Sequence, residues 1–165
     1  MSQGYCHAYI IDPNANVSSR IERGLRQVSK RMAIAQFASP NKFIQHFEQQ
    51  RLCHNALILI VVLDELASDI AQKRSDGLWQ LAITPKNRQC QGQTQIYVLT
   101  NSSNPPATTA LRQQIAINTD LELHIESIAR DVLGRHRLRL WKRRSIWAAA
   151  IWIVVSLALF VALSI

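Results

Sequence analysis

The stretch ALILIVVL, residues 56–63, consists of eight consecutive apolar side chains and is the strongest indication of the fold. A strand with one face in water alternates apolar and polar residues, whereas a strand covered on both faces is apolar throughout. Eight residues are also too few to cross a bilayer as a helix, which needs about 20. The stretch therefore predicts a central strand of a parallel sheet, buried on both faces.

Short apolar runs alternate with helical patterns on both sides of residues 56–63. Further strands are predicted at 7–12, 33–38, 95–101 and 115–118. Helices are predicted at 16–32, from Pro40 onward, at 65–73, 76–83 and 106–114, and from a Thr119–Glu122 capping box onward. This alternation predicts an α/β domain with a five-stranded, mostly parallel sheet flanked by helices.

Four segments carry a resemblance to a known family. They are YIIDPNANVSSRIERGL (9–25), SDGLWQL (75–81), IYVLTN (96–101) and IAINTDLELHIESIARDVL (115–133). Their order and spacing resemble the receiver domain of response regulators, over about residues 5–134. The resemblance implies a flavodoxin-like sheet.

The resemblance also implies a phosphoryl-transfer site, and the sequence departs from it. A receiver accepts a phosphoryl group on an Asp after its third strand, and Asp64 is the candidate here, with Asp12 and Thr100 beside it. The family uses two acids after the first strand to hold Mg²⁺, but Pro13 stands in the second place. No Lys follows the predicted fifth strand. We therefore expect phosphoryl transfer to be lost, with a working switch at Asp64 as the alternative.

Receiver relatives commonly pair through their last strand and last two helices. The resemblance implies the same face here as a contact for a protein partner or a second copy of the chain. The candidate contact residues are Ile115, Leu121, Ile125, Ile128 and Val132.

The last 20 residues, 146–165, contain no charge, Pro or Gly. They predict a single transmembrane helix, which would need about 30 Å of length. A basic segment precedes it, so the predicted organisation is a domain at 1–134, a juxtamembrane segment at 135–145 and the span. The candidate membrane-contacting residues are Arg135, Arg137, Arg139, Trp141, Lys142, Arg143, Arg144, Trp147 and Trp152.

Basic flanks stay in the cytoplasm, which predicts a tail-anchored protein of the plasma (inner) membrane with a cytoplasmic N-terminal domain. The six cations of residues 135–144 supply most of the net charge of +8, leaving +2 for residues 1–134. They would attract anionic lipid. This uneven distribution disfavours nucleic acid as the partner.

Metal and cofactor sites have weak support in the sequence. Cys6-His7 and Cys53-His54 repeat a pair of zinc-ligand types, but adjacent residues of an extended chain point to opposite sides. No Gly-rich phosphate loop and no Gly-x-Ser-x-Gly sequence is present. We therefore expect no metal, no cofactor and no enzymatic activity.

Three functions remain open. The first is a membrane-tethered, non-catalytic receiver-like adaptor or scaffold that docks a cytoplasmic partner or joins a larger membrane complex. The second is a phospho-accepting switch at Asp64. The third is a membrane-localised nucleic-acid binder that uses basic side chains of the first helix, namely Arg20, Arg23, Arg26, Lys30 and Arg31.

Overall fold

The computed structural model describes residues 6–49, 56–73, 79–82, 93–100 and 114–163. The chain divides into two compact units, residues 1–128 and 129–165. The elements are β1 (Cys6–Ile11), α1 (Ala15–Val28), β2 (Ala33–Phe37), α2 (Pro40–Gln49), β3 (Leu57–Leu63), α3 (Asp64–Ile70), β4 (Ala71–Lys73), β5 (Trp79–Leu81), β6 (Gln93–Thr100), β7 (Gln114–Ala116) and α4 (Leu121–Leu163).

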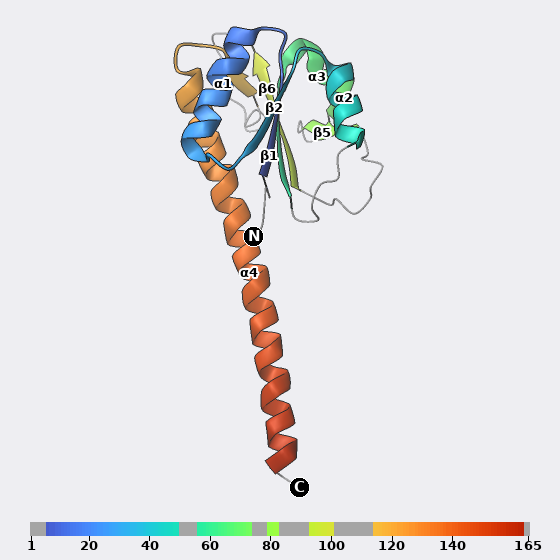
Figure 1. The fold of residues 1–165 in the computed structure, drawn as a ribbon, viewed down its shortest axis with the longest axis vertical. Helices are drawn as coiled ribbons and strands as arrows, with labels where there is room; N and C mark the ends of the chain where they lie inside the picture. Colours follow the sequence, from blue (N-terminus) through green and yellow to red (C-terminus); the bar gives the residue numbers. More distant parts are fainter. Residues whose placement is uncertain (1–5, 50–55, 74–78, 83–92, 101–113, 164–165) are drawn as a thin grey trace. The chain divides into compact units, whose positions relative to one another are not determined.

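The first unit has an α/β core with a parallel sheet. Its strand order is β2-β1-β3-β6-β7, and every neighbouring pair runs parallel. Figure 1 shows α1 on one side of the sheet and α2 and α3 on the other. From β1 the chain first adds β2 on one side and then adds β3, β6 and β7 on the other side. The direction in which strands are added therefore reverses between β1 and β3. In open α/β sheets the crevice at such a reversal is where ligands bind.

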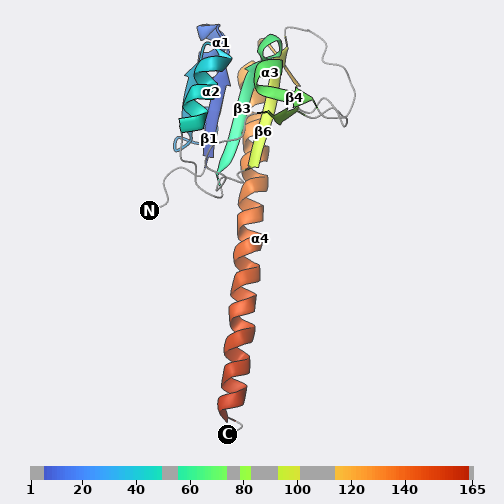
Figure 2. The ribbon, with the colours of Figure 1, turned by 90° about the vertical axis from the view of Figure 1, so that its right-hand side faces the viewer.

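β3 is the central buried strand that its sequence predicts. Its first six residues are buried, and it pairs with β1 on one side and β6 on the other (Figure 2). Successive side chains enter opposite layers of the core. The layer under α2 and α3 includes Tyr9, Ile11, Phe43, Phe47, Ile58, Ile60, Val62, Ala67, Ile70, Ile96 and Val98.

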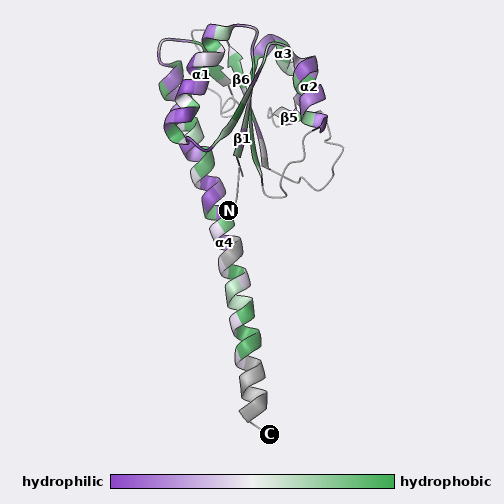
Figure 3. Cartoon of the chain, viewed as in Figure 1, coloured by the Kyte–Doolittle hydropathy of each residue, from purple (hydrophilic) through white to green (hydrophobic). Residues whose placement is uncertain are grey.

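The covering helices are amphipathic, as their apolar spacing predicts. Ile21 and Leu25 of α1 are fully buried, and so are Phe43 and Phe47 of α2. Figure 3 shows apolar strands between helices whose outer surfaces are hydrophilic. α2 begins at Pro40, as predicted, because the fixed φ of proline suits the first turn of a helix.

The helix predicted at 76–83 is wrong where the structure describes it. Trp79–Leu81 forms β5, which pairs antiparallel with β4 in a separate two-stranded sheet. The amide of Ala82 extends the pairing by donating to the carbonyl of Ile70 at 2.9 Å. The helix predicted at 65–73 likewise ends at Ile70. Short segments have ambiguous periodicity, and here backbone pairing decides their conformation. Nearly all of the helix predicted at 106–114 lies outside the described residues.

The predicted transmembrane helix is also corrected. α4 is continuous from Leu121 to Leu163, but within the described residues no helix has an apolar stretch long enough to cross a membrane. The first part of α4 is rich in charged side chains. The tail-anchored topology and the membrane location therefore lose their support.

Candidate functional site

The carboxyl ends of β1 and β3 bring two predicted residues to one edge of the sheet. β1 ends at Ile11 and is followed by Asp12, while β3 ends at Leu63 and is followed by Asp64. Ile11 lies opposite Val62 in the parallel register. Asp12 and Asp64 therefore both lie at the position where the strand order reverses.

Asp12 is a buried acid with only part of its hydrogen-bonding capacity used. Its side chain is 4% exposed, and Oδ1 accepts a hydrogen bond from the backbone amide of Asn14 at 2.7 Å. Among the described residues, Oδ2 has no hydrogen-bond partner. Burial raises the pKa of this carboxyl, and the bond from Asn14 opposes the rise only in part. Folding therefore favours the protonated acid at this position.

Asn14 and Ser18 explain why the chain holds Asp12 in this place. Asn14 caps α1 by accepting hydrogen bonds from the amides of Asn16 and Val17. The buried Ser18 hydroxyl donates to the carbonyl oxygen of Asp12 at 3.4 Å, and the amide of Asp12 donates to the carbonyl of Phe37. Asp12 is thus part of the turn between β1 and α1.

The other residues of the predicted phosphoryl site occupy different environments. Asp64 is exposed and is the first residue of α3. Thr100 ends β6, is half-buried, and accepts a backbone hydrogen bond from the amide of Ile117 at 2.9 Å. Ile117 and Asn118 follow β7, where a receiver would carry its Lys. Neither of the two residues directly after β7 is therefore a Lys, although Arg20 of α1 reaches the carbonyl of Asn118.

No metal centre is assembled in the described part of the chain, where no three His, Cys, Asp or Glu side chains come together as potential ligands. Cys6 is a free thiol, and burial raises its pKa to about 11, which keeps it protonated. Cys53 and His54 lie outside the described residues. A lone buried carboxylate such as Asp12 offers a hard cation fewer oxygen ligands than Mg²⁺ sites use.

The predicted partner-contact residues are mostly core residues. Ile115, Leu121 and Ile125 are at most 3% exposed and Ile128 is partly buried, while Val132 belongs to the second unit. Ile115, Leu121 and Ile125 are therefore not available on the surface of the chain. The exposed side chains of the same turns of α4 are Leu123, His124 and Ser127.

The residues named for membrane contact lie on α4 in the second unit. Trp141, Trp147 and Trp152 are exposed, and Arg135 pairs with Asp131 one helical turn away. Arg137, Arg139 and Lys142 are exposed as well. The side chains of Arg143 and Arg144 lie outside the description.

A polar contact joins α1 to the start of α4, and no sequence pattern predicts it. The carboxylate of Glu122 accepts from Arg23 at 3.0 Å and lies 3.6 Å from Arg20. Arg20 also donates to the carbonyls of Asn118 and Thr119. Glu122 thus pairs with α1, and the side chain of Asn118, instead of the predicted Thr119, accepts from the amide of Asp120. No local pattern indicates this pairing, because the partners are about a hundred residues apart.

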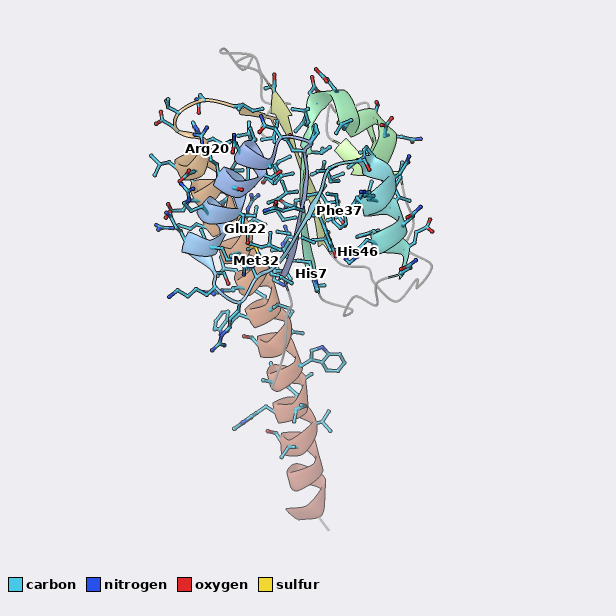
Figure 4. The ribbon with its side chains drawn as sticks, turned by 45° about the horizontal axis from the view of Figure 1, so that its top comes forward. His7, Arg20, Glu22, Met32, Phe37 and His46 are labelled. Atoms are coloured by element: carbon cyan, nitrogen blue, oxygen red, sulfur yellow. The ribbon has the colours of Figure 1, made fainter. Side chains whose placement is uncertain are left out.

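These ion pairs also bear on the nucleic-acid alternative. Three of the five basic side chains named for nucleic-acid binding already have partners within the chain. Arg20 and Arg23 pair with Glu122. Arg26 pairs with Glu22 and donates to the carbonyl of Met32. Figure 4 shows Arg20, Glu22 and Met32 on the α1 side of the sheet. The engaged cations would have to give up these contacts to bind phosphates, so the phosphate-binding capacity of α1 is reduced.

A cluster of aromatic rings lies on the opposite side, where Figure 4 labels Phe37 and His46. The ring of Tyr9 is 5.4 Å from that of Phe43 and 5.8 Å from that of Phe47, and His46 lies 5.2 Å from Phe37. Burial raises the pKa of Tyr9 to about 12. Tyr9, Phe43 and Phe47 belong to the core between α2 and the sheet, while His46 is exposed at its margin.

Comparison of the chain with protein-family models, with curated proteins and with solved structures gives no match.

Proposed function

We propose that this chain is a receiver-like binding domain without phosphoryl-transfer activity, and that its task is to dock a protein partner. The observation that carries the proposal is the carboxyl edge of the sheet. That edge offers one buried acid, Asp12, with Pro13 after it, and a neutral pair, Ile117 and Asn118, after β7. Without a second acid after β1 and a Lys directly after β7, the negative charge of a phosphoryl group in transfer would have little stabilisation from these positions.

The docking surface that best fits the proposal is the outer face of the first turns of α4. Leu123 is 65% exposed on this face, and its neighbours on the inner face anchor the helix in the core. Arg20, Arg23 and Glu122 hold the same turns against α1. An exposed leucine on a firmly held helix can enter an apolar pocket of a partner at a small entropic cost.

A capture experiment with the full chain as bait tests the docking. We expect one stoichiometric partner to be recovered with the native chain and lost with Leu123→Arg. Leu138→Arg is the matched control, because Leu138 is also an exposed leucine of α4, 60% exposed, but in the second unit. Recovery of no stoichiometric partner, or equal recovery with both variants, would contradict the proposal.

The second candidate, a phospho-accepting switch at Asp64, has one favourable observation. Asp64 is exposed directly after the central strand, on the edge that also carries Asp12. Incubation of the full chain with Mg²⁺ and acetyl phosphate, followed by intact-mass analysis, separates the two candidates. We expect no added phosphoryl group; a stable adduct that disappears in Asp64→Asn would instead establish the switch.

A further inference from the structure

β2 forms one edge of the parallel sheet, because β1 is its only neighbour among the described strands. The carbonyl of Phe37 accepts from the amide of Asp12, so the backbone groups of Phe37 point toward β1. In an extended strand these directions alternate from residue to residue. The amides and carbonyls of Ile34 and Gln36 therefore point outward, away from the sheet.

The sequence of β2 has none of the features that commonly prevent an edge strand from pairing with another strand. Natural edge strands are commonly protected by a charge, a proline, a bulge or a very short length. β2 has the sequence AIAQF, with no charged residue, Pro or Gly, and its five residues pair with β1 in unbroken register. The opposite edge strand, β7, has only three residues. Among the described strands, β2 is therefore the edge that is open to another strand.

The strand is also complementary to itself. A two-fold axis at Ala35 would place a second β2 antiparallel to the first, with Ile34 opposite Gln36 of the second copy and Ala35 opposite Ala35. Ala33, Ala35 and Phe37 share the α2 side of the sheet, because they lie beside His7, Tyr9 and Ile11 of β1. On that side each large Phe37 would face a small Ala33 of the second copy.

The backbone pattern agrees with the same axis. Ile34 and Gln36, whose polar groups point outward, would form the two hydrogen-bonded pairs, with four backbone hydrogen bonds between the copies. Ala35, whose groups point toward β1, would form the close pair without hydrogen bonds, in which Cα atoms are about 4.5 Å apart. The ladder would end at Met32, whose carbonyl already accepts from Arg26 at 2.9 Å.

We propose that β2 pairs antiparallel with β2 of a second copy of this chain about a two-fold axis at Ala35, joining two sheets into one. Ile34 and Phe37 are only partly buried within one copy, and this pairing covers more of their apolar surface. The pairing goes beyond the proposed function and does not depend on it, because it uses neither the carboxyl edge nor the exposed face of α4.

Disulfide formation in the full chain tests this register. In a background with Cys6, Cys53 and Cys90 replaced by serine, we expect Ala35→Cys to form an interchain disulfide under mild oxidation. The expected Cα separation lies within the range of about 4.4–6.8 Å that disulfides span. Ile34→Cys and Gln36→Cys should each stay uncross-linked alone but should form a heterodisulfide when the two proteins are mixed.

A further variant and the gel pattern of the single cysteine variants test whether β2 pairs with β2 of a second copy. Adding Ile34→Lys to Ala35→Cys should abolish the cross-link while leaving the circular dichroism spectrum unchanged, because a lysine at an edge opposes strand pairing. If Ala35→Cys is folded but stays monomeric on a non-reducing gel, the proposal is overturned. Equal cross-linking by all three single cysteine variants would also overturn it, since random collision has no register.

Discussion

Replacement of Gly24 by alanine is expected to lower the free energy of unfolding by about 1–2 kcal/mol, although alanine is the better helix former. A Cβ atom at Gly24 would lie 2.8 Å from the backbone carbonyl oxygen of Glu122 and 3.2 Å from Cγ2 of Ile125. The carbonyl belongs to the first turns of α4 and cannot rotate away as a side chain could. Overpacking costs about 1–3 kcal/mol, while the gain in helix propensity is at most about 1 kcal/mol.

Gly134→Ala is the matched control for this prediction. Gly134 also lies inside a helix, but a Cβ atom there would meet nothing within 4 Å. We expect this variant to be as stable as the native chain or up to about 1 kcal/mol more stable. Urea unfolding of both full-length variants, followed by circular dichroism, measures the difference. If Gly24→Ala proved as stable as Gly134→Ala, α1 and α4 would not be in the close contact described.

The second prediction concerns pH. Because folding raises the pKa of Asp12, the folded chain keeps a proton at this position between the unfolded and the folded pKa, where the unfolded chain has released it. The contribution of Asp12 to stability is therefore greatest below its unfolded pKa, about 3.9, and is lost as the pH rises through the folded value. At neutral pH the native chain carries a buried, partly unpaired carboxylate, which destabilises it.

Asp12→Asn is expected to remove this dependence. Asparagine keeps an oxygen for the amide of Asn14 and brings no charge, so the variant should be about 1–3 kcal/mol more stable than the native chain at pH 7. The advantage should shrink toward pH 4. Asp69→Asn, which removes an exposed carboxylate, controls for the change in net charge. If Asp12→Asn lowered the free energy of unfolding at pH 7 and left its pH dependence unchanged, the buried carboxylate of Asp12 would not be the source of that dependence.

Local patterns were enough for several elements. The unbroken apolar run at 56–63 predicts a strand covered on both faces, and β3 is that strand. The apolar spacing of α1 and α2, and Pro40 at the start of α2, also predict what the structure has. By contrast, residues 79–81 read as helix and form β5, because its pairing with β4 outweighs a weak local preference.

The position of the candidate site could be predicted from the sequence, but the burial and hydrogen bonding of its residues could not. Asp12 and Asp64 each follow an apolar run, and parallel strands bring such positions to one edge. The sequence could not tell that Asp12 would be buried, with one oxygen that has no hydrogen-bond partner among the described residues, while Asp64 would be exposed. It also assigned Ile115, Leu121 and Ile125 to a partner surface, although the same apolar spacing places them in the core.

An α/β core around residues 57–63 follows from local patterns alone, because periodicity and continuous apolar runs are local properties that burial must satisfy. The strand order, the edge position of β2, the burial of Asp12 and the pairing of Arg20 and Arg23 with Glu122 depend on the three-dimensional fold. These features arise from contacts between residues far apart in the chain. Hydrogen bonds and ion pairs of that kind leave no periodic trace in the sequence.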